Sequence, residues 1–463
     1  MPIQSINPAT GEIIKTYIED SVEVVTDKLA LADETFKSWS KTPVENRVEL
    51  LRKVAITLEK NLEKYAQIIT LEMGKTITEA KAEVKKCASV FVYYADNSSK
   101  ILANEEFTVD AGAKAYTRLD PLGVILAVMP WNFPFWQVMR FAAPALLAGN
   151  TCVLKHASNV PASALELEQI FLDSGLPKGA FQTLLIGSGQ VESVINDPRV
   201  KAVTLTGSEY AGSQVAATAG KALKKTVLEL GGSDPFIVLE DADLDRVLDG
   251  AIAGRLINNG QSCIAAKRFI VSQELADEFT SRLVERVKAM RIGDPSLEDT
   301  QLAPMVNAAG VEEIQAQIQA AVKSGAKLVY GGDKPAGLDP KLKNGFFINP
   351  AILTDVDSNS RVFAEETFGP VFAITTFKDE SEAVALANNS DLGLGSSIWT
   401  KDIVKAEELA AQIESGSVFI NQQVRSDPRL PFGGIKKSGY GRELSYHGLR
   451  EFVNVKTVFI AGK

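Results

Sequence analysis

Apolar positions recur at helical spacing between residues 44 and 72, with lysines and glutamates between them. The apolar positions are Val48, Leu51, Val54, Leu58, Leu62, Tyr65 and Ile69. Recurrence at roughly every third or fourth position places these side chains on one face of a helix. The pattern therefore predicts an amphipathic helix over 44–72 that packs against a core.

After residue 122, short apolar runs alternate with helical patterns. The runs predict strands at 123–129, 151–155, 181–187, 200–207 and 226–230, with helices at 162–173, 190–196 and 209–223. Short apolar strands separated by helices are typical of βαβ units, in which the strands form a parallel sheet.

A second series of the same kind follows. It predicts strands at 235–239, 268–272, 396–400 and 417–421. It also predicts one helix that begins at Leu244, a second that ends at about Met290 and a third over 311–324. The stretch 331–345, rich in Gly, Pro and Lys, predicts a surface loop. Together the two series predict an α/β fold with two doubly wound α/β domains.

Composition narrows the class of protein. The 463 residues carry a net charge of −9, from 49 basic and 58 acidic residues without a basic run, which disfavours nucleic-acid binding. The longest apolar run, around Val124 to Met129, is too short to cross a membrane, and the first residues lack a signal-peptide pattern. The cysteines are Cys87, Cys152 and Cys263, and neither CxxC nor HxxxH occurs. We therefore expect a reduced, cytoplasmic protein without a metal site or a disulfide framework.

Two glycine motifs stand at predicted strand ends, although the GxGxxG fingerprint does not occur. In LTGSEYAG (205–212), a strand leads directly into a helix whose free N–H groups could bind a phosphate. The alternative is a simple glycine turn with Ser208 as the helix cap. In LELGGSDP (228–235), burial would raise the pKa of Glu229 and suit it as a general base. The alternative is a glutamate whose oxygens are satisfied by the glycine amides.

Three further residues could carry chemistry. Asn132 stands in the proline-bounded turn PWNFP and could donate to an oxyanion, or only form the turn. Lys155 ends a strand and could meet a ribose or phosphate, or be solvated. Cys263, in NNGQSCIAAK, could be a nucleophile or a small buried apolar residue, which is how we interpret Cys87 and Cys152.

The order of these motifs along the chain is more specific than any one of them. The motifs are PWNFP, K-x-x-S from Lys155, TGS, ELGG, GQSC, EETFGP (365–370) and PFGGIKKSGYGRE (431–443). Together they resemble the aldehyde dehydrogenase superfamily, from INPATGE (6–12) to the last strand. The stretches SDPRLPFGG and SGYGREL are most similar to the NADP-using succinate-semialdehyde dehydrogenases of that superfamily.

The resemblance implies oxidation of an aldehyde to an acid, with succinate semialdehyde as the expected substrate and a broader range of short aldehydes as the alternative. Cys263 would attack the aldehyde, and Asn132 with the Cys263 N–H would hold the oxyanion. Glu229 would then activate water to hydrolyse the thioester. Cys263 has no charged neighbour in sequence before Lys267, so backbone dipoles and the bound nicotinamide are the hypothesis for its ionisation.

The resemblance also implies the cofactor contacts. Lys155 and Ser158 would lie at the adenosine ribose, and Gly207 and Ser208 at the pyrophosphate. Glu366 would bind the nicotinamide ribose, with Phe368 beside it, and Trp131 would also contact the cofactor. A serine at 158 can donate to a 2′-phosphate, which the glutamate of NAD-preferring relatives would repel. We therefore expect NADP to be the preferred cofactor and NAD to be used less well.

For the substrate carboxylate, the resemblance implies Arg140, with an ordinary ion pair as the alternative. Ile257 stands where some relatives have a second arginine, and Ala265 where they have a further cysteine, so no disulfide switch is expected there. The loop before PFGG could complete the pocket through Arg425, Ser426 and Arg429.

The resemblance further implies a division of the chain. Residues 1–104 and 122–231 would form a Rossmann-like dinucleotide-binding domain, and 232–432 the catalytic domain. Segments 105–121 and 433–463 would form a small β oligomerisation arm and the C-terminal segment, in a homodimer or homotetramer. The alternating apolar residues of the last strand fit an edge that needs covering.

Three other classes fit the residues less well. An acyl-transfer enzyme that passes the thioester to CoA or phosphate would not need Glu229. A non-catalytic member of the fold would not need the whole set of catalytic residues. A thiol hydrolase would need a histidine beside Cys263, but neither His156 nor His447 has an evident orienting partner in the sequence.

Overall fold

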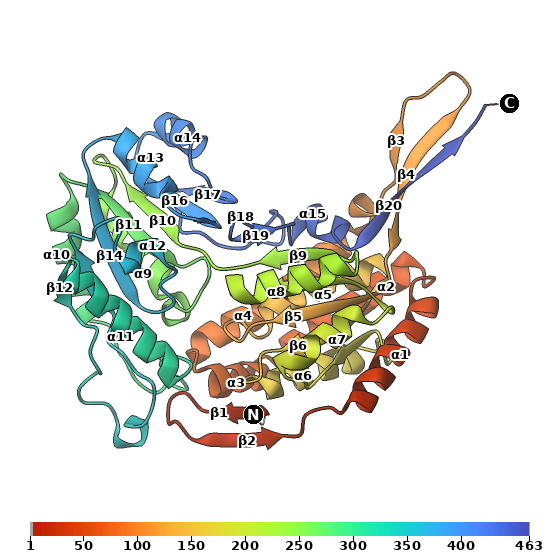
Figure 1. Cartoon of the computed structure of the whole chain (residues 1–463), viewed down its shortest axis with the longest axis horizontal. Helices are drawn as coiled ribbons and strands as arrows, with labels where there is room; N and C mark the ends of the chain where they lie inside the picture. The colour runs from red at the N-terminus through yellow and green to blue at the C-terminus, as the bar shows by residue number, and fades with distance from the viewer. Residues whose placement is uncertain (1–2, 463) are drawn as a thin grey trace.

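The computed structural model describes residues 3–462 and shows two lobes, with a narrow arm projecting from one of them (Figure 1). Each lobe contains a sheet covered by helices. The chain passes from the first sheet to the second between β9 (Lys225–Glu229) and β10 (Asp234–Val238). The predicted α/β class, with two mainly parallel sheets, is confirmed.

The first sheet has the strand order β19-β9-β8-β5-β6-β7, and all neighbours except β19 and β9 are parallel. Its strands besides β9 are β5 (Val124–Met129), β6 (Thr151–His156), β7 (Phe181–Thr183), β8 (Val200–Thr206) and β19 (Gly439–Tyr440). The chain enters at β5, adds β6 and β7 on one side, and then adds β8 and β9 on the other. In doubly wound sheets, ligands bind beyond the carboxyl ends of the strands where the order reverses, here between β5 and β8.

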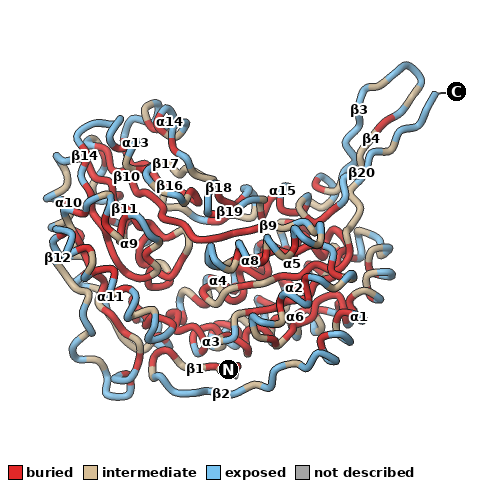
Figure 2. Tube along the Cα trace, viewed as in Figure 1, coloured by how far each residue is buried: buried red, intermediate tan, exposed pale blue. Residues whose placement is uncertain are grey.

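The inner strands β5, β6 and β8 of this sheet are almost entirely buried (Figure 2). In β5, Ile125 and Ala127 pack into one apolar cluster, whereas Val124 and Leu126 pack into the cluster on the opposite face. Successive side chains of a strand point to opposite faces, so a sheet covered on both sides requires the uninterrupted apolar runs seen in the sequence.

Helices cover both faces of the first sheet. They are α1 (Val22–Trp39), α2 (Val44–Lys60), α3 (Leu62–Met73), α4 (Ile77–Ile101), α5 (Trp136–Ala148), α6 (Pro161–Asp173), η1 (Ser188–Gln190), α7 (Val191–Asn196), α8 (Glu209–Lys221) and α15 (Ser445–Arg450). The prediction of one helix over 44–72 was wrong in one respect. At Asn61 the backbone leaves helical geometry (φ −109°, ψ 25°), so the segment forms α2 and α3.

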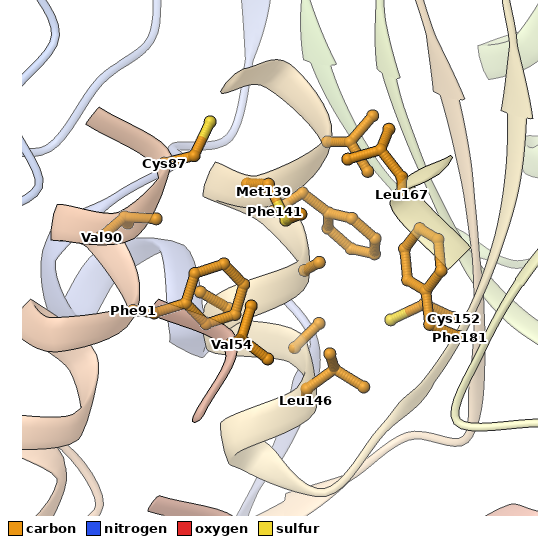
Figure 3. Close-up of a cluster of buried hydrophobic side chains, with 14 of the residues drawn as sticks. Val54, Cys87, Val90, Phe91, Met139, Phe141, Leu146, Cys152, Leu167 and Phe181 are labelled. Atoms are coloured by element: carbon orange, nitrogen blue, oxygen red, sulfur yellow. The ribbon is translucent and has the colours of Figure 1, made fainter. Parts of the chain in front are cut away.

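Helix α5 forms the centre of the first lobe, because every residue from Trp136 to Ala148 is buried. Figure 3 shows part of the apolar cluster around it. Cys87 and Cys152 lie in this cluster, buried and not disulfide-bonded, so their interpretation as apolar core residues is confirmed. Burial raises the pKa of both thiols, which keeps them protonated and unreactive.

The second sheet has the order β12-β13-β14-β11-β10-β16-β17 and is parallel except for β12. Its strands besides β10 are β11 (Ala266–Ser272), β12 (Lys327–Tyr330), β13 (Ala351–Thr354), β14 (Val371–Phe377), β16 (Gly395–Trp399) and β17 (Ser417–Ile420). Its helices are α9 (Leu244–Leu256), η2 (Ile257–Gly260), α10 (Ala276–Lys288), α11 (Ala308–Lys323), η3 (Pro340–Leu342), α12 (Arg361–Ala364), α13 (Glu380–Asn388) and α14 (Ile403–Ala410). The sequence pattern did not predict β12, β13 and β14.

The arm is a three-stranded sheet of order β20-β4-β3 (Figure 1). It consists of β3 (Glu105–Phe107), β4 (Lys114–Pro121) and β20 (Val453–Ile460). β20 pairs with β4 on one side only, and Val455, Phe459 and Ile460 are exposed, as expected for an edge strand. The remaining strands form two short pairs, β1 (Ile3–Ile6) with β2 (Ile13–Tyr17) and β15 (Leu392–Gly393) with β18 (Ile435–Lys436). Within residues 3–462, none of the helices has both the length and the apolar character that a membrane span requires.

Candidate functional site

A cavity of about 220 Å³ opens at the carboxyl ends of β5 and β8, where the strand order of the first sheet reverses. It is lined by seven residues named from the sequence, Trp131, Asn132, Gly207, Ser208, Cys263, Glu366 and Phe368, and by Pro130, Gln137, Thr206, Leu230 and Gly231. The fold therefore brings segments far apart in the sequence to one place.

The side chain of Asn132 is fixed beside the cysteine loop. Its Nδ2 donates to the Gln261 carbonyl (2.9 Å), and its Oδ1 accepts from Gln137 Nε2 (3.1 Å). Because Nδ2 carries two hydrogens, one remains for another acceptor. This arrangement can hold an oxyanion formed next to Cys263.

The loop before Cys263 has an unusual backbone. Asn258 and Asn259 have left-handed φ values of 51° and 53°, a conformation that asparagine tolerates better than most residues. The Asn258 side chain donates to the Asn132 carbonyl (2.8 Å) and to the Gln261 carbonyl (3.1 Å). It therefore ties the cysteine loop to the turn that carries Asn132.

Cys263 itself is half-buried, and burial raises the pKa of its thiol to about 12. Lys267 in β11 folds back under the same loop, where its Nζ donates to the carbonyls of Ser262 (2.9 Å) and Cys263 (2.6 Å). Of the charges near Cys263, Lys267 and then Arg140 lower the thiol pKa. No cation stands directly beside Cys263 in the sequence, and the fold supplies one by turning Lys267 back toward it.

At one end of the cavity, β8 leads through Gly207 into α8. The Ser208 hydroxyl accepts from the Ala211 N–H (3.3 Å), so Ser208 is the helix cap and also lines the cavity. A Cβ at Gly207 would come no closer than 3.5 Å to another part of the protein, at Leu205. Packing within the protein thus does not require glycine there, and a bare backbone before a helix N-terminus fits the phosphates of a dinucleotide.

At the other end, the Glu366 carboxylate accepts from the Gly232 N–H (3.1 Å) and forms an ion pair with Lys267 (3.3 Å). A Cβ at Gly231 would lie 2.5 Å from Glu366 Oε2, so only glycine allows this approach. The rings of Trp131 and Phe368 meet edge to face with centroids 5.7 Å apart. A carboxylate beside two aromatic rings fits the nicotinamide ribose end of the same cofactor.

Lys155 and Ser158 do not line the cavity. Lys155 lies at the end of β6 next to Val128 of β5, and Ser158 lies in the turn that follows. Lys155 is buried, which lowers its pKa, whereas Ser158 is exposed. Because β6 is adjacent to β5, both residues lie at the edge of the sheet where the cavity opens.

Glu229 immediately precedes Leu230, which lines the cavity, but does not line the cavity itself. Its carboxyl is buried, and within residues 3–462 neither oxygen has a hydrogen-bond partner. The Gly232 N–H donates to Glu366 instead, so the alternative in which the glycine amides satisfy Glu229 is wrong. Burial, and next Glu443, raise the pKa of Glu229 well above its ordinary value, against an opposing effect of Arg140. A buried carboxyl of this kind is suited to proton transfer.

Arg140 faces these carboxyl groups and does not line the cavity. Its guanidinium pairs with Glu443, donates to Thr206 Oγ1 (3.3 Å) and lies 4.8 Å from the centre of the Phe432 ring. The structure thus shows the ion pair that was the alternative to a substrate role.

Arg425 and Arg429, in the loop before PFGG, were expected to complete a substrate pocket, but both are exposed. Arg429 is 71% exposed, and its guanidinium donates to both carboxylate oxygens of Asp427 (2.8 and 2.6 Å). The structure therefore does not bring Arg429 to the site. Arg425 is also exposed.

Ser426 of the same loop is buried and contacts a lysine that the sequence pattern did not single out. Its hydroxyl accepts from Lys86 Nζ (2.7 Å) and from Trp136 Nε1 (3.1 Å). The Lys86 ammonium also lies 4.4 Å from the centre of the Trp136 ring. Burial, and next Arg140, lower the pKa of Lys86 to about 8.

Two glutamates of α4, Glu83 and Glu79, bind the backbone of segments that form the site, and the sequence pattern did not single them out either. Glu83 accepts from the N–H groups of Phe135 and Trp136 (2.9 Å each) at the start of α5. Glu79 accepts from the Asn258 N–H (2.7 Å). The T-x-x-E sequence at Thr76 signals the start of a helix, but not which loops its glutamate would hold.

Neither histidine is placed to accept a proton from Cys263. His156 Nε2 lies 2.8 Å from the Pro134 carbonyl, and its Nδ1 accepts from the Ala157 N–H (2.9 Å), so both ring nitrogens are occupied. Burial lowers the pKa of His156 to about 4. His447 is exposed on α15. A Cys-His hydrolase is therefore disfavoured.

Residues 1–458 match the aldehyde dehydrogenase family. Over 461 residues the chain is 51% identical to a probable NADP+-dependent succinate-semialdehyde dehydrogenase from Synechocystis sp., with each chain covered in full. It is 49% identical over 463 residues to succinate-semialdehyde dehydrogenase (NADP+) 1 from Mycobacterium tuberculosis, again with each chain covered in full. The crystal structure of succinic semialdehyde dehydrogenase from Streptococcus pyogenes with NADP+ matches with a TM-score of 0.96 and 42% identity, covering 99% of this chain and 100% of the other. The resemblance in the motifs is confirmed, and the chain belongs to the aldehyde dehydrogenase family, whose members oxidise aldehydes to acids.

Proposed function

We propose that the chain oxidises succinate semialdehyde to succinate with NADP+, with Cys263 as the nucleophile. The observation that carries the proposal is the single cavity that joins Cys263 and the Asn132 amide to Gly207, Ser208 and Glu366. The named substrate and cofactor of the two curated relatives support the same choice.

The residues divide the reaction between them. The Cys263 sulfur bonds to the aldehyde carbon, and the resulting oxyanion accepts from the free N–H of Asn132 Nδ2 and from the Cys263 N–H. NADP+ held by Gly207, Ser208 and Glu366 would supply the two-electron oxidation of the Cys263 thiohemiacetal to the thioester. Glu229 takes a proton from the water that attacks the thioester carbon, and the Cys263 sulfur leaves with the electron pair of the broken bond.

The test is the growth of NADPH absorbance with succinate semialdehyde. Wild-type protein should produce NADPH and succinate in equal amounts without CoA or added phosphate. Cys263→Ala should produce neither. Dependence on CoA or phosphate would instead indicate acyl transfer, and turnover by Cys263→Ala would overturn the assignment of the nucleophile.

We attribute the preference for NADP over NAD to Lys155 and Ser158 at the end of β6. The Ser158 hydroxyl can donate to a 2′-phosphate, and the nearby ammonium of Lys155 adds a favourable charge. Ser158→Glu should lower kcat/KM with NADP and raise it with NAD, whereas Ser158→Ala should lower only the NADP value. An unchanged ratio in Ser158→Glu would remove this explanation.

For the substrate carboxylate we propose the basic group around Ser426, formed by Lys86 and Arg425, because Arg140 is already paired with Glu443. No carboxylate pairs with Lys86 among the described residues, and its ammonium rests on Trp136 beside Ser426. Lys86→Met should raise KM for succinate semialdehyde by roughly ten- to a hundredfold, as for a lost charged hydrogen bond. It should leave KM for butanal within about threefold. Equal changes for both substrates would exclude this pocket.

The remaining expectations concern the assembly and its location. We propose that residues 105–121 and the C-terminal strand exchange between subunits of a homodimer or homotetramer, which the exposed apolar residues of β20 support. Sedimentation of the chain with and without residues 453–463 tests this. We propose that the two domains divide at 231/232, between the last strand of the first series, β9, and the first strand of the second sheet, β10. A reducing compartment, the cytoplasm, suits an enzyme whose nucleophile is a free thiol.

A further inference from the structure

Lys267 is the most completely enclosed lysine near the site. Its side chain has no exposed surface, and its Nζ donates to the carbonyls of Ser262 and Cys263. On the other side, the same ammonium faces the Glu366 carboxylate at 3.3 Å. One lysine thus contacts both the cysteine loop and the carboxylate that lines the far end of the cavity.

Charged groups face Cys263 from four parts of the fold. Lys267 of β11 and Arg140 of α5 favour the thiolate, whereas Glu366, after α12, and Asp234 of β10 oppose it. Arg140 is paired with Glu443, so its charge is largely engaged elsewhere. Lys267 is bound mainly to neutral carbonyls, and its charge is countered in part by Glu366 and by Asp234, whose own pKa is raised to about 7. A cation held by neutral dipoles keeps most of its field at the nearby sulfur.

We propose that Lys267 is a positioning residue that fixes the Cys263 loop and favours the Cys263 thiolate, with Glu366 acting against it as a partial counter-charge. This inference rests on the proposed role of Cys263 as the nucleophile. Lys267 does not line the cavity, and it acts through the peptide groups of residues 262 and 263 and through its charge. Any group that takes up the charge of Glu366 strengthens the effect of Lys267 on the sulfur.

The proposal predicts opposite effects for two neighbouring substitutions. Lys267→Met removes the cation while keeping most of the side-chain length, so the thiol pKa should rise by about one. Glu366→Gln removes the counter-charge while its amide oxygen can still accept from the Gly232 N–H, so the thiol pKa should fall. A change in loop structure alone would have no reason to act in opposite directions.

The experiment measures alkylation of the full chain by iodoacetamide without cofactor, over about pH 6–10, with the labelled peptide identified by mass spectrometry. Below its pKa a thiol reacts in proportion to its thiolate fraction, so a thiol pKa that is higher by one slows the reaction about tenfold. We expect Lys267→Met to react about tenfold more slowly than wild type and Glu366→Gln severalfold faster. Cys87 and Cys152 are buried and should remain unlabelled in all variants.

Arg47→Met provides a matched control. Arg47 is also a buried cation held by neutral carbonyls, those of Leu147 and Thr42, and it does not contact the cysteine loop. Its removal should leave the alkylation rate of Cys263 within about threefold of wild type. A change as large as that of Lys267→Met would show that loss of any buried cation perturbs the site, and would overturn the inference.

Two further outcomes overturn it. One is a change of the rate in the same direction for Lys267→Met and Glu366→Gln. The other applies if Lys267→Met does not fold: the half-buried Glu366 then carries the test, and an unchanged or slower rate in Glu366→Gln contradicts the proposal. Failure of the proposed function is a separate result, because it appears as NADPH formation that survives Cys263→Ala.

Discussion

Two buried charged clusters flank the cysteine, and they differ in how their charges are satisfied. The lysine cluster consists of Lys267, Glu366 and Asp234, and its ammonium has carbonyl and carboxylate partners. The glutamate cluster consists of Glu229, Glu443 and Arg140. In this cluster Glu443 pairs with Arg140, whereas the Glu229 carboxyl has no hydrogen-bond partner among residues 3–462.

This difference separates two tasks. A buried cation with fixed dipoles around it holds the backbone in place. Two buried carboxyls that share one arginine cannot both ionise without cost, so one of them retains a proton, and the pKa of Glu229 is raised accordingly. The lysine cluster is therefore suited to fixing the nucleophile, and the glutamate cluster to accepting and releasing protons.

The largest effect is expected from removing the base of the glutamate cluster. Glu229→Gln keeps the shape of the side chain but cannot take a proton from water, so kcat should fall about 10²- to 10⁴-fold. The first turnover should still release NADPH, because oxidation precedes hydrolysis. Stopped-flow absorbance separates the two phases.

Glu72→Gln is the matched control for this substitution. Glu72 is equally buried, but its carboxylate accepts from Ala162 and Ser163 in a distant part of the first lobe. Its substitution should leave kcat within about threefold of wild type in folded protein. Wild-type turnover by Glu229→Gln would show that the glutamate cluster takes no part in hydrolysis.

The lysine cluster should appear in the pH dependence of stability. Burial raises the pKa of Asp234 from 3.8 to about 7, so between these values the folded protein holds a proton that the unfolded chain releases. Stability from this group is therefore present at low pH and lost as the pH rises toward 7. Asp234→Asn removes the loss and should gain about 2–4 kcal/mol in unfolding free energy at pH 8 relative to pH 5.

Urea unfolding of both proteins at the two pH values provides the measurement. The amide oxygen of the variant can still accept from the Gly395 N–H, so the gain is not offset by a lost hydrogen bond. Asp241→Asn is the control of opposite sign, because hydrogen bonds from Thr400, Lys401 and Asp402 outweigh partial burial and lower the pKa of Asp241. If Asp234→Asn had the same pH dependence as wild type, Asp234 would not be a buried acid facing Lys267.

The fold class and part of the cavity lining were accessible from local patterns in the sequence, whereas Trp131, Glu366 and Phe368 were implied only by the resemblance to the family. Parallel strands buried on both faces appear as apolar runs, and the residues at their carboxyl ends meet at one edge. Asn132, Gly207 and Ser208 follow such runs directly, which is why the structure places them together.

The sequence singled out Glu229 and Arg140, but the partner of Arg140 was not accessible in this way. The pairing of Arg140 with Glu443 and the contact of Lys86 with Ser426 join segments hundreds of residues apart, and nothing in local periodicity selects these partners. Local pattern also failed at β7, where the apolar run continues past Thr183. There the backbone turns and the Ile186 N–H donates to the Leu184 carbonyl (3.0 Å), so the strand ends early.

The smallest expected effect tests whether the two carboxyls of the glutamate cluster titrate together. Glu443→Gln removes the like charge facing Glu229 and frees Arg140 to face it alone, and both changes lower the pKa of Glu229. The base must be deprotonated to act, so hydrolysis rises with pH through this pKa. The acid limb of the kcat profile should therefore move lower by about one pH unit, giving about a tenfold gain at acidic pH and little change at high pH. A limb that stays in place, or moves to higher pH, would show that Glu443 does not set the proton affinity of Glu229, and that burial alone does.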